Sequence, residues 1–294
     1  IFVAVCFIPL AERPVPGQSG TVFALWMVIL MFCRDFLVTS LRTSLSMRDA
    51  PMRTSVLAKF KTAIQMAAAC YLLAALIGQM ADPEGWTVNI VMAVAAAIPT
   101  TWVLTRLIQG RTPGKRSITM AALTSLYVAV QILFGPAVAM PLLVYGVVAI
   151  TVVSGFSYLV DAWSAIKGRP GGVREAFRFI LEGLLVPTAL LLPLGRFETT
   201  GMSALIILAI TLELATGGLA NLLASKKVLM RFRLVALKSI LEVLFAGAAV
   251  VIHEFDLLPG WFAGELCIAA AAAVALVHAA ASFIRHRRIY LDQL

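Results

Sequence analysis

The sequence predicts an all-α integral membrane protein, a polytopic helix bundle with about nine transmembrane helices and a short N-terminal apolar stub. Three observations support this prediction. Hydrophobic residues make up 61% of the 294 residues, charged residues only 13%, and the mean hydropathy is +0.95, which excludes an ordinary soluble domain. Disorder would require low hydrophobicity, and the four cysteines do not form the pattern of a disulfide framework. Long apolar runs also recur along the whole chain.

The chain opens with an apolar stub, residues 1–10. This run is shorter than the roughly 20 residues that are needed to cross a bilayer. A signal peptide is disfavoured because no basic residue precedes the run and no small-residue cleavage site follows it. Since the first residue is Ile1 and not Met, we expect the chain to have been cut at its front.

Nine later segments are long and apolar enough to cross a membrane. Backbone groups in lipid must find their hydrogen bonds within the segment, so each one is expected to be a helix. The segments are 21–45, 57–80, 87–108, 118–138, 141–166, 176–194, 201–224, 232–253 and 261–284.

The basic residues predict one orientation for all these spans. If Arg42 lies in the cytoplasm, alternate loops hold 21 of the 24 Lys and Arg residues, and the opposite loops hold Arg13 and Arg196. This is the pattern of the positive-inside rule and predicts a multi-pass protein of the cell (cytoplasmic) membrane. Nucleic acid is not an expected partner, because the charges lie in short loops without a soluble domain. Membrane lipids with anionic headgroups and phosphorylated substrates suit them better.

A polar, flexible turn at 167–172 (KGRPGG) divides the chain. It predicts two units, residues 1–167 and residues 173–294. Residues 26–74 and 206–250 share an order of features, namely an apolar span, a small-residue patch, a basic loop and a lysine near the next span, which indicates an internal repeat. The alternative is that membrane hairpins in general have this order.

A ladder of polar residues lies on one face of the first span. At about 100° per residue, Asp35 and Arg42 fall within roughly 20° of each other, with Thr39 between them and Arg34 at the flank. Together with Lys61 at the start of the next span, these cations would surround a cytoplasm-facing pocket that grips a phosphate. The competing interpretation is an ion pair of Asp35 with Arg34 or Arg42 that only holds the bundle together.

These residues resemble a known family. The run 34–42 (RDFLVTSLR), followed by 61–66 (KTAIQM), is similar to the second half of bacterial phosphatidylglycerophosphate synthases, and 154–159 (SGFSYL) resembles their closing Ser-Gly-x-Asp-Tyr signature. These enzymes belong to the CDP-alcohol phosphatidyltransferases, integral membrane proteins with six helices per unit.

The sequence departs from the family pattern in several places. Asp35 stands where the family usually has Glu, Ala58 where it has Gly, and Ser157 where it has Asp. Either the span 87–108 is additional, or Gly-Lys-Arg-Ser at 114–117 begins a diverged copy of the Lys-Thr helix.

The resemblance implies transfer of a phosphatidyl group from CDP-diacylglycerol to glycerol 3-phosphate, which gives phosphatidylglycerophosphate and CMP. It assigns the acceptor phosphate to Arg34, Arg42, Lys59 and Lys61, and implies a homodimer. The family's four acids, in the signature D-x-x-D-G-x-x-A-R-x8-G-x3-D-x3-D, hold two divalent metal ions, Mg²⁺ or Mn²⁺. That signature does not occur in residues 1–167, so we expect the metal ligands upstream of Ile1. No catalytic or metal-binding residue is assigned within the chain, which is expected to be inactive on its own.

The second unit resembles the same family more distantly. Residues 178–187 (RFILEGLLVP) are similar to the family's first helix, and 213–221 (ELATGGLAN) matches the spacing of the metal signature. The match keeps two small residues, Gly217 and Ala220. The first two acids of the signature correspond to Glu213 and Thr216, and its arginine corresponds to Asn221. The later glycine corresponds to Met230, and the last two acids correspond to Leu234 and Lys238. Because a lysine at the fourth acid position cannot be a ligand of Mg²⁺, the unit is interpreted as a degenerate copy. The alternative is a chance fit to a small-residue packing patch.

A different class of function also fits the sequence. The chain could be a non-catalytic membrane pseudoenzyme or a transporter that binds an anionic phosphate ligand. Transporters built from repeats often have inverted halves, whereas both units here are predicted to run in the same direction, which disfavours a transporter.

Overall fold

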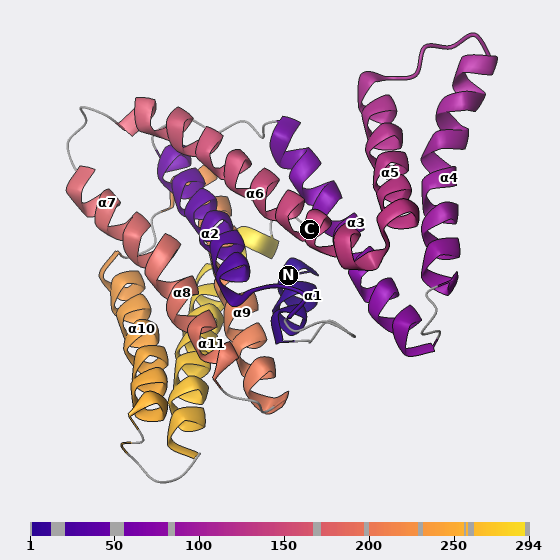
Figure 1. Cartoon of the computed structure of the whole chain (residues 1–294). Coiled ribbons are helices and arrows are strands. Elements are labelled where there is room, and N and C mark those ends of the chain that lie inside the picture. Colours follow the sequence, from indigo (N-terminus) through magenta and orange to yellow (C-terminus); the bar gives the residue numbers. More distant parts are fainter. Residues whose placement is uncertain are drawn as a thin grey trace. The chain divides into compact units, whose positions relative to one another are not determined.

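The computed structural model describes residues 2–12, 21–47, 56–81, 86–166, 172–196, 200–228, 232–255, 257 and 262–291, and within these ranges it contains helices and no strands (Figure 1). The all-α class is therefore confirmed. The helices are α1 (Phe2–Glu12), α2 (Leu25–Met47), α3 (Val56–Ala81), α4 (Trp86–Ile108), α5 (Lys115–Phe134), α6 (Pro136–Ile166), α7 (Gly172–Ile180), the π-helical turn η1 (Leu181–Leu185), α8 (Val186–Leu191), the 3-10 turn η2 (Leu192–Gly195), α9 (Thr200–Ser225), α10 (Phe232–Glu254) and α11 (Phe262–Leu291).

Most described residues of the nine segments predicted to span a membrane are helical, with residues 21–24 and Gly135 as exceptions, but nine spans are not confirmed. Six helical stretches of the described chain are long and apolar enough to cross a bilayer, which indicates a multi-pass membrane protein. The helix α2 carries Arg34, Asp35 and Arg42 in its middle, and the apolar stretch of α3 covers only Phe60–Ala74. The six stretches are Ser117–Phe134, Val138–Val160, Phe177–Leu194, Gly201–Ser225, Arg233–Glu254 and Ala263–Ile289.

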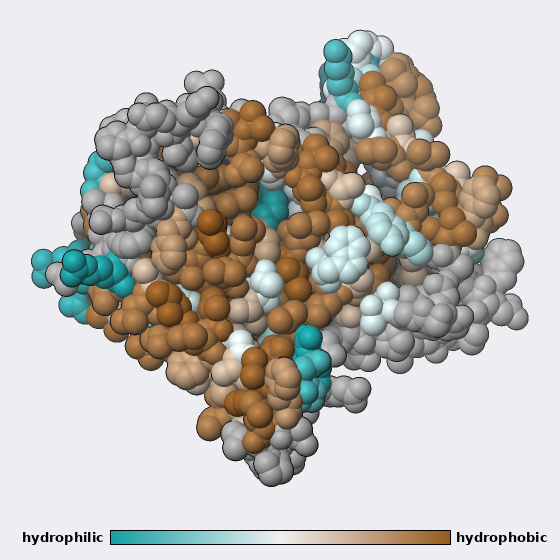
Figure 2. Space-filling model, turned by 60° about the vertical axis from the view of Figure 1, so that its left-hand side comes forward, coloured by the Kyte–Doolittle hydropathy of each residue, from teal (hydrophilic) through white to brown (hydrophobic). Residues whose placement is uncertain are grey.

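Apolar side chains cover much of the molecular surface. Figure 2 shows a face on which hydrophobic residues predominate. On α5, for example, Leu126, Leu133 and Phe134 are exposed over 62%, 74% and 63% of their area. In water such a surface would drive aggregation, whereas lipid tails are as apolar as these side chains. The surface therefore fits a protein whose solvent is the bilayer.

The described chain forms two compact units. One consists of Ile1–Glu12, Phe23–Lys59 and Ile150–Leu294, and we call it the α2 unit; the other consists of Arg13–Val22 and Phe60–Ala149. This division follows spatial contacts and passes through α6, so it does not test the repeat proposed from the sequence. The predicted boundary at 167–172 lies outside the described residues except for Gly172. The division into residues 1–167 and 173–294 remains a prediction.

The helix α2 is the element around which the α2 unit is organised. It packs against α1, α7, η1, α8 and α9. No Gly or Pro interrupts residues 25–47, which suits a continuous helix. Its hydroxyl groups find acceptors within the helix or on a neighbour: Thr39 donates to the carbonyl group of Asp35 at 2.8 Å, and Thr43 lies 3.1 Å from the carbonyl oxygen of Thr39 and 2.7 Å from Oδ1 of Asn221 in α9. The polar residues of α2 are thereby tolerated among apolar neighbours.

The predicted stub is a helix in the structure. The helix α1 packs against α2 and α9, and its Phe7 is fully buried. The ring of Phe7 meets the ring of Phe23 edge to face, with 5.0 Å between the centroids. The stub is therefore part of the folded α2 unit.

Two glycines allow other helices to approach α2 closely. A Cβ atom on Gly183 of η1 would lie 3.1 Å from the Cα atom of Leu37, and one on Gly217 of α9 would lie 2.7 Å from Cγ2 of Thr39. Small residues at such positions let backbones pack together in membrane proteins, where apolar burial gives little drive for association. The glycines thus fix how near η1 and α9 lie to α2.

Polar side chains link the helices of the compact unit that contains Phe60–Ala149. Tyr71 of α3 donates from its hydroxyl group to Oε1 of Gln131 in α5 at 2.7 Å, and Nε2 of Gln131 donates to Oδ1 of Asn89 in α4 at 3.3 Å. The hydroxyl oxygens of Thr100 in α4 and Ser125 in α5 lie 3.1 Å apart and share a hydrogen bond. Such bonds link three helices across their apolar faces.

The close packing at Gly217 yields a test with a matched neighbour. Gly217→Ala should destabilise the protein by about 1–3 kcal/mol, because the added methyl group overpacks against the stiff, β-branched Thr39. Gly218→Ala is the control, since a Cβ atom at Gly218 has no neighbour within 4 Å. Thermal unfolding in detergent measures both variants. Equal Tm values for the two would contradict the packing described for α2 and α9.

Candidate functional site

Two arginines of α2 converge on one tyrosine of α6. The Cζ atoms of Arg34 and Arg42 each lie 5.4 Å from the ring centroid of Tyr158, within the range of a cation–π interaction. Nη2 of Arg42 also donates to the Tyr158 hydroxyl group at 3.2 Å. The two arginines are eight residues apart and share one helix face with Val38, which packs on Tyr158. Tyr158 is only 1% exposed, so it holds both guanidinium groups from within the protein.

The position of Arg34 is fixed by three neighbours. Its Nη1 donates to Oδ1 of Asp35 at 2.8 Å and its Nη2 to Oγ of Ser154 at 2.9 Å. Gly155 leaves the space that the side chain fills, because a Cβ atom there would lie 2.5 Å from Cγ of Arg34. The ion pair proposed between Asp35 and Arg34 is therefore present, while Arg42 bonds to Tyr158.

The resulting cluster of Arg34, Asp35, Arg42 and Tyr158, here called the arginine–tyrosine cluster, carries an excess of positive charge. Among the described side chains, two guanidinium groups accompany one carboxylate. The side chain of Arg34 is 10% exposed, and the buried Nε atoms of Arg34 and Arg42 have no hydrogen-bond partner within the described part of the chain. Arginine presents N–H groups in a planar fork that matches a phosphate or a carboxylate. The cluster can therefore receive an anion.

The structure brings together two of the four cations predicted to bind phosphate. Arg34 and Arg42 meet at Tyr158, as described above. Lys61 lies on α3 in the other compact unit, where it is 5% exposed. The side chain of Lys59 lies outside the described residues. A pocket formed by all four cations remains a prediction.

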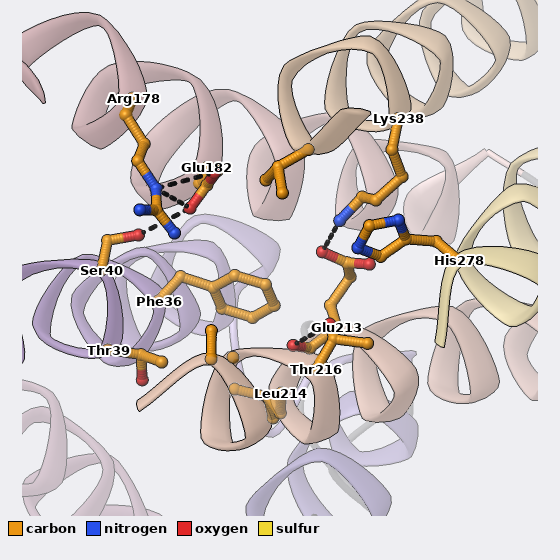
Figure 3. Close-up of a pocket in the computed structure, with 13 residues that line it drawn as sticks. Phe36, Thr39, Ser40, Arg178, Glu182, Glu213, Leu214, Thr216, Lys238 and His278 are labelled. Carbon is orange, nitrogen blue, oxygen red and sulfur yellow. Dashed lines mark hydrogen bonds and ion pairs between the residues drawn. The ribbon is translucent and has the colours of Figure 1, made fainter. Parts of the chain in front are cut away.

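A second group of polar residues surrounds a cavity of about 50 Å³ (Figure 3). On one side, Nε of Arg178 donates to both carboxylate oxygens of Glu182 at 3.0 Å and 2.9 Å, and Oγ of Ser40 donates to Oε2 of Glu182 at 3.1 Å. Glu182 lies in the π-helical turn η1, and such turns are frequent at functional sites. The lining residues are Phe36, Thr39, Ser40, Arg178, Glu182, Glu213, Leu214, Thr216, Gly217, Ala220, Val235, Lys238 and His278.

On the other side of this cavity lies a buried cluster of three charges, Glu213, Lys238 and Glu242, which we call the charged triad. Nζ of Lys238 donates to Oε2 of Glu213 and lies 3.3 Å from Oε2 of Glu242. The side chains of Lys238 and Glu213 are 7% exposed and that of Glu242 is fully buried. His278 of α11 lies beside Glu213 and Lys238 (Figure 3). Burial of these charges is costly unless they pair, which explains why they meet.

The sequence indicated part of the charged triad and missed the rest. Glu213 and Lys238 occupy the first and the fourth acid positions of the proposed alignment, and the structure pairs them. Of the other positions, Leu234 is exposed over 48% of its area and Met230 lies outside the described residues, so the alignment itself remains a prediction. Glu242 was missed, although an acid one helical turn after a lysine in an apolar span is a usable signal.

Comparison with known proteins finds a similarity to one family in the first part of the chain. Residues 1–104 match the model of the CDP-alcohol phosphatidyltransferase family. This match includes α1 to α3 and most of α4, and therefore Arg34 and Arg42; Tyr158 and the charged triad lie beyond it. Neither the curated proteins nor the solved structures contain a significant match. A CDP-alcohol phosphatidyltransferase transfers a phospholipid headgroup and generally depends on a divalent metal.

The described residues do not fit the divalent metal of that family. Among them, no three His, Cys, Asp or Glu side chains are grouped so that they could hold a metal ion. Glu213 and Lys238 align with two metal ligands of the family, and the ammonium group of Lys238 contacts Glu213. No step of a reaction is therefore assigned to a metal bound by these residues.

The arginine–tyrosine cluster yields a second test. Tyr158→Phe keeps the aromatic ring but removes the hydroxyl acceptor of Arg42, and should cost about 1.5–3 kcal/mol of stability, the range for hydrogen bonds to charged groups. Tyr158→Leu should cost more, because both guanidinium groups also lose the ring. Tyr145→Phe on the same helix is the control, since Tyr145 is 57% exposed. Thermal unfolding measures the loss of stability in each variant. An equal loss in Tyr158→Phe and Tyr145→Phe would contradict the role given to the hydroxyl group.

Proposed function

We propose that this protein synthesises phosphatidylglycerophosphate, by transferring the phosphatidyl group of CDP-diacylglycerol to glycerol 3-phosphate with release of CMP. The proposal is supported by the family match of residues 1–104 and by the resemblance of runs 34–42 and 61–66 to phosphatidylglycerophosphate synthases. The reaction would take place at the cytoplasmic face of the cell membrane, where the positive-inside rule locates the basic loops.

One observation carries the proposal, namely the excess positive charge of the arginine–tyrosine cluster. Arg34 and Arg42 are stacked on Tyr158, and among the side chains that the structure describes Asp35 is the carboxylate that pairs with Arg34. An acceptor with a phosphate group would supply the missing negative charge and two or more oxygens for the guanidinium forks. Zwitterionic serine or an uncharged alcohol would leave that net charge uncompensated. The cluster therefore favours an acceptor that carries a phosphate group, such as glycerol 3-phosphate or inositol phosphate.

The residues of this chain would bind and orient the acceptor. Tyr158 and Ser154 hold the guanidinium groups in place before the substrate arrives, which reduces the entropy lost on binding. Lys59 and Lys61 would add positive charge to the same phosphate. The free hydroxyl oxygen of the acceptor would then form a bond to the phosphorus of the phosphatidyl group as the bond from that phosphorus to the CMP oxygen breaks, and the hydroxyl proton is released. The family generally depends on a divalent metal ion, and no described residue of this chain is assigned to hold it.

Steady-state kinetics of the whole encoded protein test this assignment. Arg42→Lys keeps the charge but loses the planar fork, so the KM for glycerol 3-phosphate should rise roughly 10-fold or more, while the KM for CDP-diacylglycerol stays within about 2-fold. Arg111→Lys is the matched control, because Arg111 is an exposed residue of the loop between α4 and α5. Equal increases in both KM values for Arg42→Lys would contradict an acceptor-phosphate site at Arg42.

The alternative function is a non-catalytic pseudoenzyme or transporter that binds an anionic phosphate ligand. It is favoured by the charged triad, where a lysine stands at a position that aligns with a metal ligand. The two functions differ in one measurement on the whole encoded protein. A pseudoenzyme would bind radiolabelled glycerol 3-phosphate without releasing CMP from CDP-diacylglycerol in the presence of Mg²⁺ or Mn²⁺, whereas the synthase would do both.

A further inference from the structure

The charged triad contains more buried carboxyl groups than ammonium groups. Two carboxylates, Glu213 of α9 and Glu242 of α10, accompany the single ammonium group of Lys238. Oε1 of Glu213 and both carboxylate oxygens of Glu242 are buried and have no hydrogen-bond partner in the described part of the chain. Unpaired buried carboxylate oxygens are costly, so the triad is a place where a positively charged group is needed.

The ammonium group lies where it serves both carboxylates. Nζ of Lys238 bonds to Oε2 of Glu213 and is 3.3 Å from Oε2 of Glu242. Lys238 and Glu242 are one turn apart on α10, whereas Glu213 comes from α9, so the cation links two helices. Two carboxylates that meet around one point are also the oxygen ligands that a divalent cation prefers.

We propose that Glu213 and Glu242 form a divalent-cation site that is filled by the ammonium group of Lys238. The lysine makes this part of the protein independent of metal ions, and its removal opens the site to a divalent cation. The proposal concerns the second half of the chain alone and does not rest on the transferase function proposed above.

The neighbouring cavity supplies what else a cation needs. It is lined by Glu213 and by the hydroxyl groups of Thr216 and Ser40, and its volume of about 50 Å³ has room for a few water molecules. Mg²⁺ and Mn²⁺ in proteins commonly keep several waters beside one or two carboxylates. The remaining charges near the cavity, Arg178 and Glu182, pair with each other and leave the balance of the triad unchanged.

Charge counting gives the expected behaviour of a variant. Lys238 is the cation that the described structure brings to the two carboxyl groups of the triad, and His278 is the titratable group that faces the triad from α11. In Lys238→Met, two buried carboxylates face each other with no cation between them. That variant should lose roughly 5–10 °C in Tm when EDTA is present, and MnCl₂ or MgCl₂ should restore a large part of the loss.

The control separates the triad from any other metal site in the protein. The triple variant Glu213→Gln, Lys238→Met, Glu242→Gln has the same loss of lysine but no carboxylates, so its Tm should respond to MnCl₂ only as much as that of the parent. Metal ions bound elsewhere, including ions needed for transferase activity, stabilise all three proteins alike. The predicted result is therefore an additional metal-dependent rise in Tm that occurs in Lys238→Met alone.

Three outcomes would overturn the proposal. The first is a Tm of Lys238→Met that MnCl₂ raises no more than in the parent, and the second is an equal additional rise in the triple variant. The third is a rise that NaCl of the same ionic strength reproduces, which would indicate screening and not binding. If Lys238→Met does not fold, recovery of the triple variant at the parent's yield supports the proposal, and loss of both variants overturns it.

Discussion

The stacking of Arg34 and Arg42 on Tyr158 is the interaction on which the α2 unit depends. Charged groups among membrane-spanning helices are costly unless they are paired, and α2 carries three of them at its middle. The tyrosine ring, Ser154 and Asp35 together hold the guanidinium groups, and Gly155 makes room for them. Because Ser154 and Tyr158 come from α6, the cluster also ties α2 to a helix more than one hundred residues away along the chain.

The two buried charge clusters differ in which charged group is in the majority. In the arginine–tyrosine cluster two guanidinium groups accompany one carboxylate, whereas in the charged triad two carboxyl groups accompany one ammonium group. The first excess suits an anionic ligand and underlies the proposed acceptor site. The second is already occupied by a cation of the chain itself, which explains how that region keeps its acids without a metal. The cavity beside the triad is also lined by Thr39 and Phe36 of α2, so one helix serves both regions.

Sequence reasoning located the helices and the polar face of α2, because apolar run lengths and helical spacing are local properties. It named residues 34–42 and 154–159 separately, but the contact between Arg42 and Tyr158 depends on how α2 and α6 pack, which the sequence does not state. Glu242 was not predicted, because it lies beyond Lys238, the last position of the aligned signature. The π-helical turn that presents Glu182 has no local sequence signal. The site of four cations was predicted, yet only Arg34 and Arg42 are placed together by the described structure.

The central claim is that the positive excess at Tyr158 selects an acceptor with a phosphate group. The most direct measurement is CMP release from CDP-diacylglycerol by the whole encoded protein in Mg²⁺, with glycerol 3-phosphate, glycerol, serine and inositol phosphate compared as acceptors at equal concentration. The account predicts release that depends on the phosphate group, with glycerol 3-phosphate the best acceptor and glycerol inactive. Release with glycerol or serine at the rate seen with glycerol 3-phosphate would contradict it.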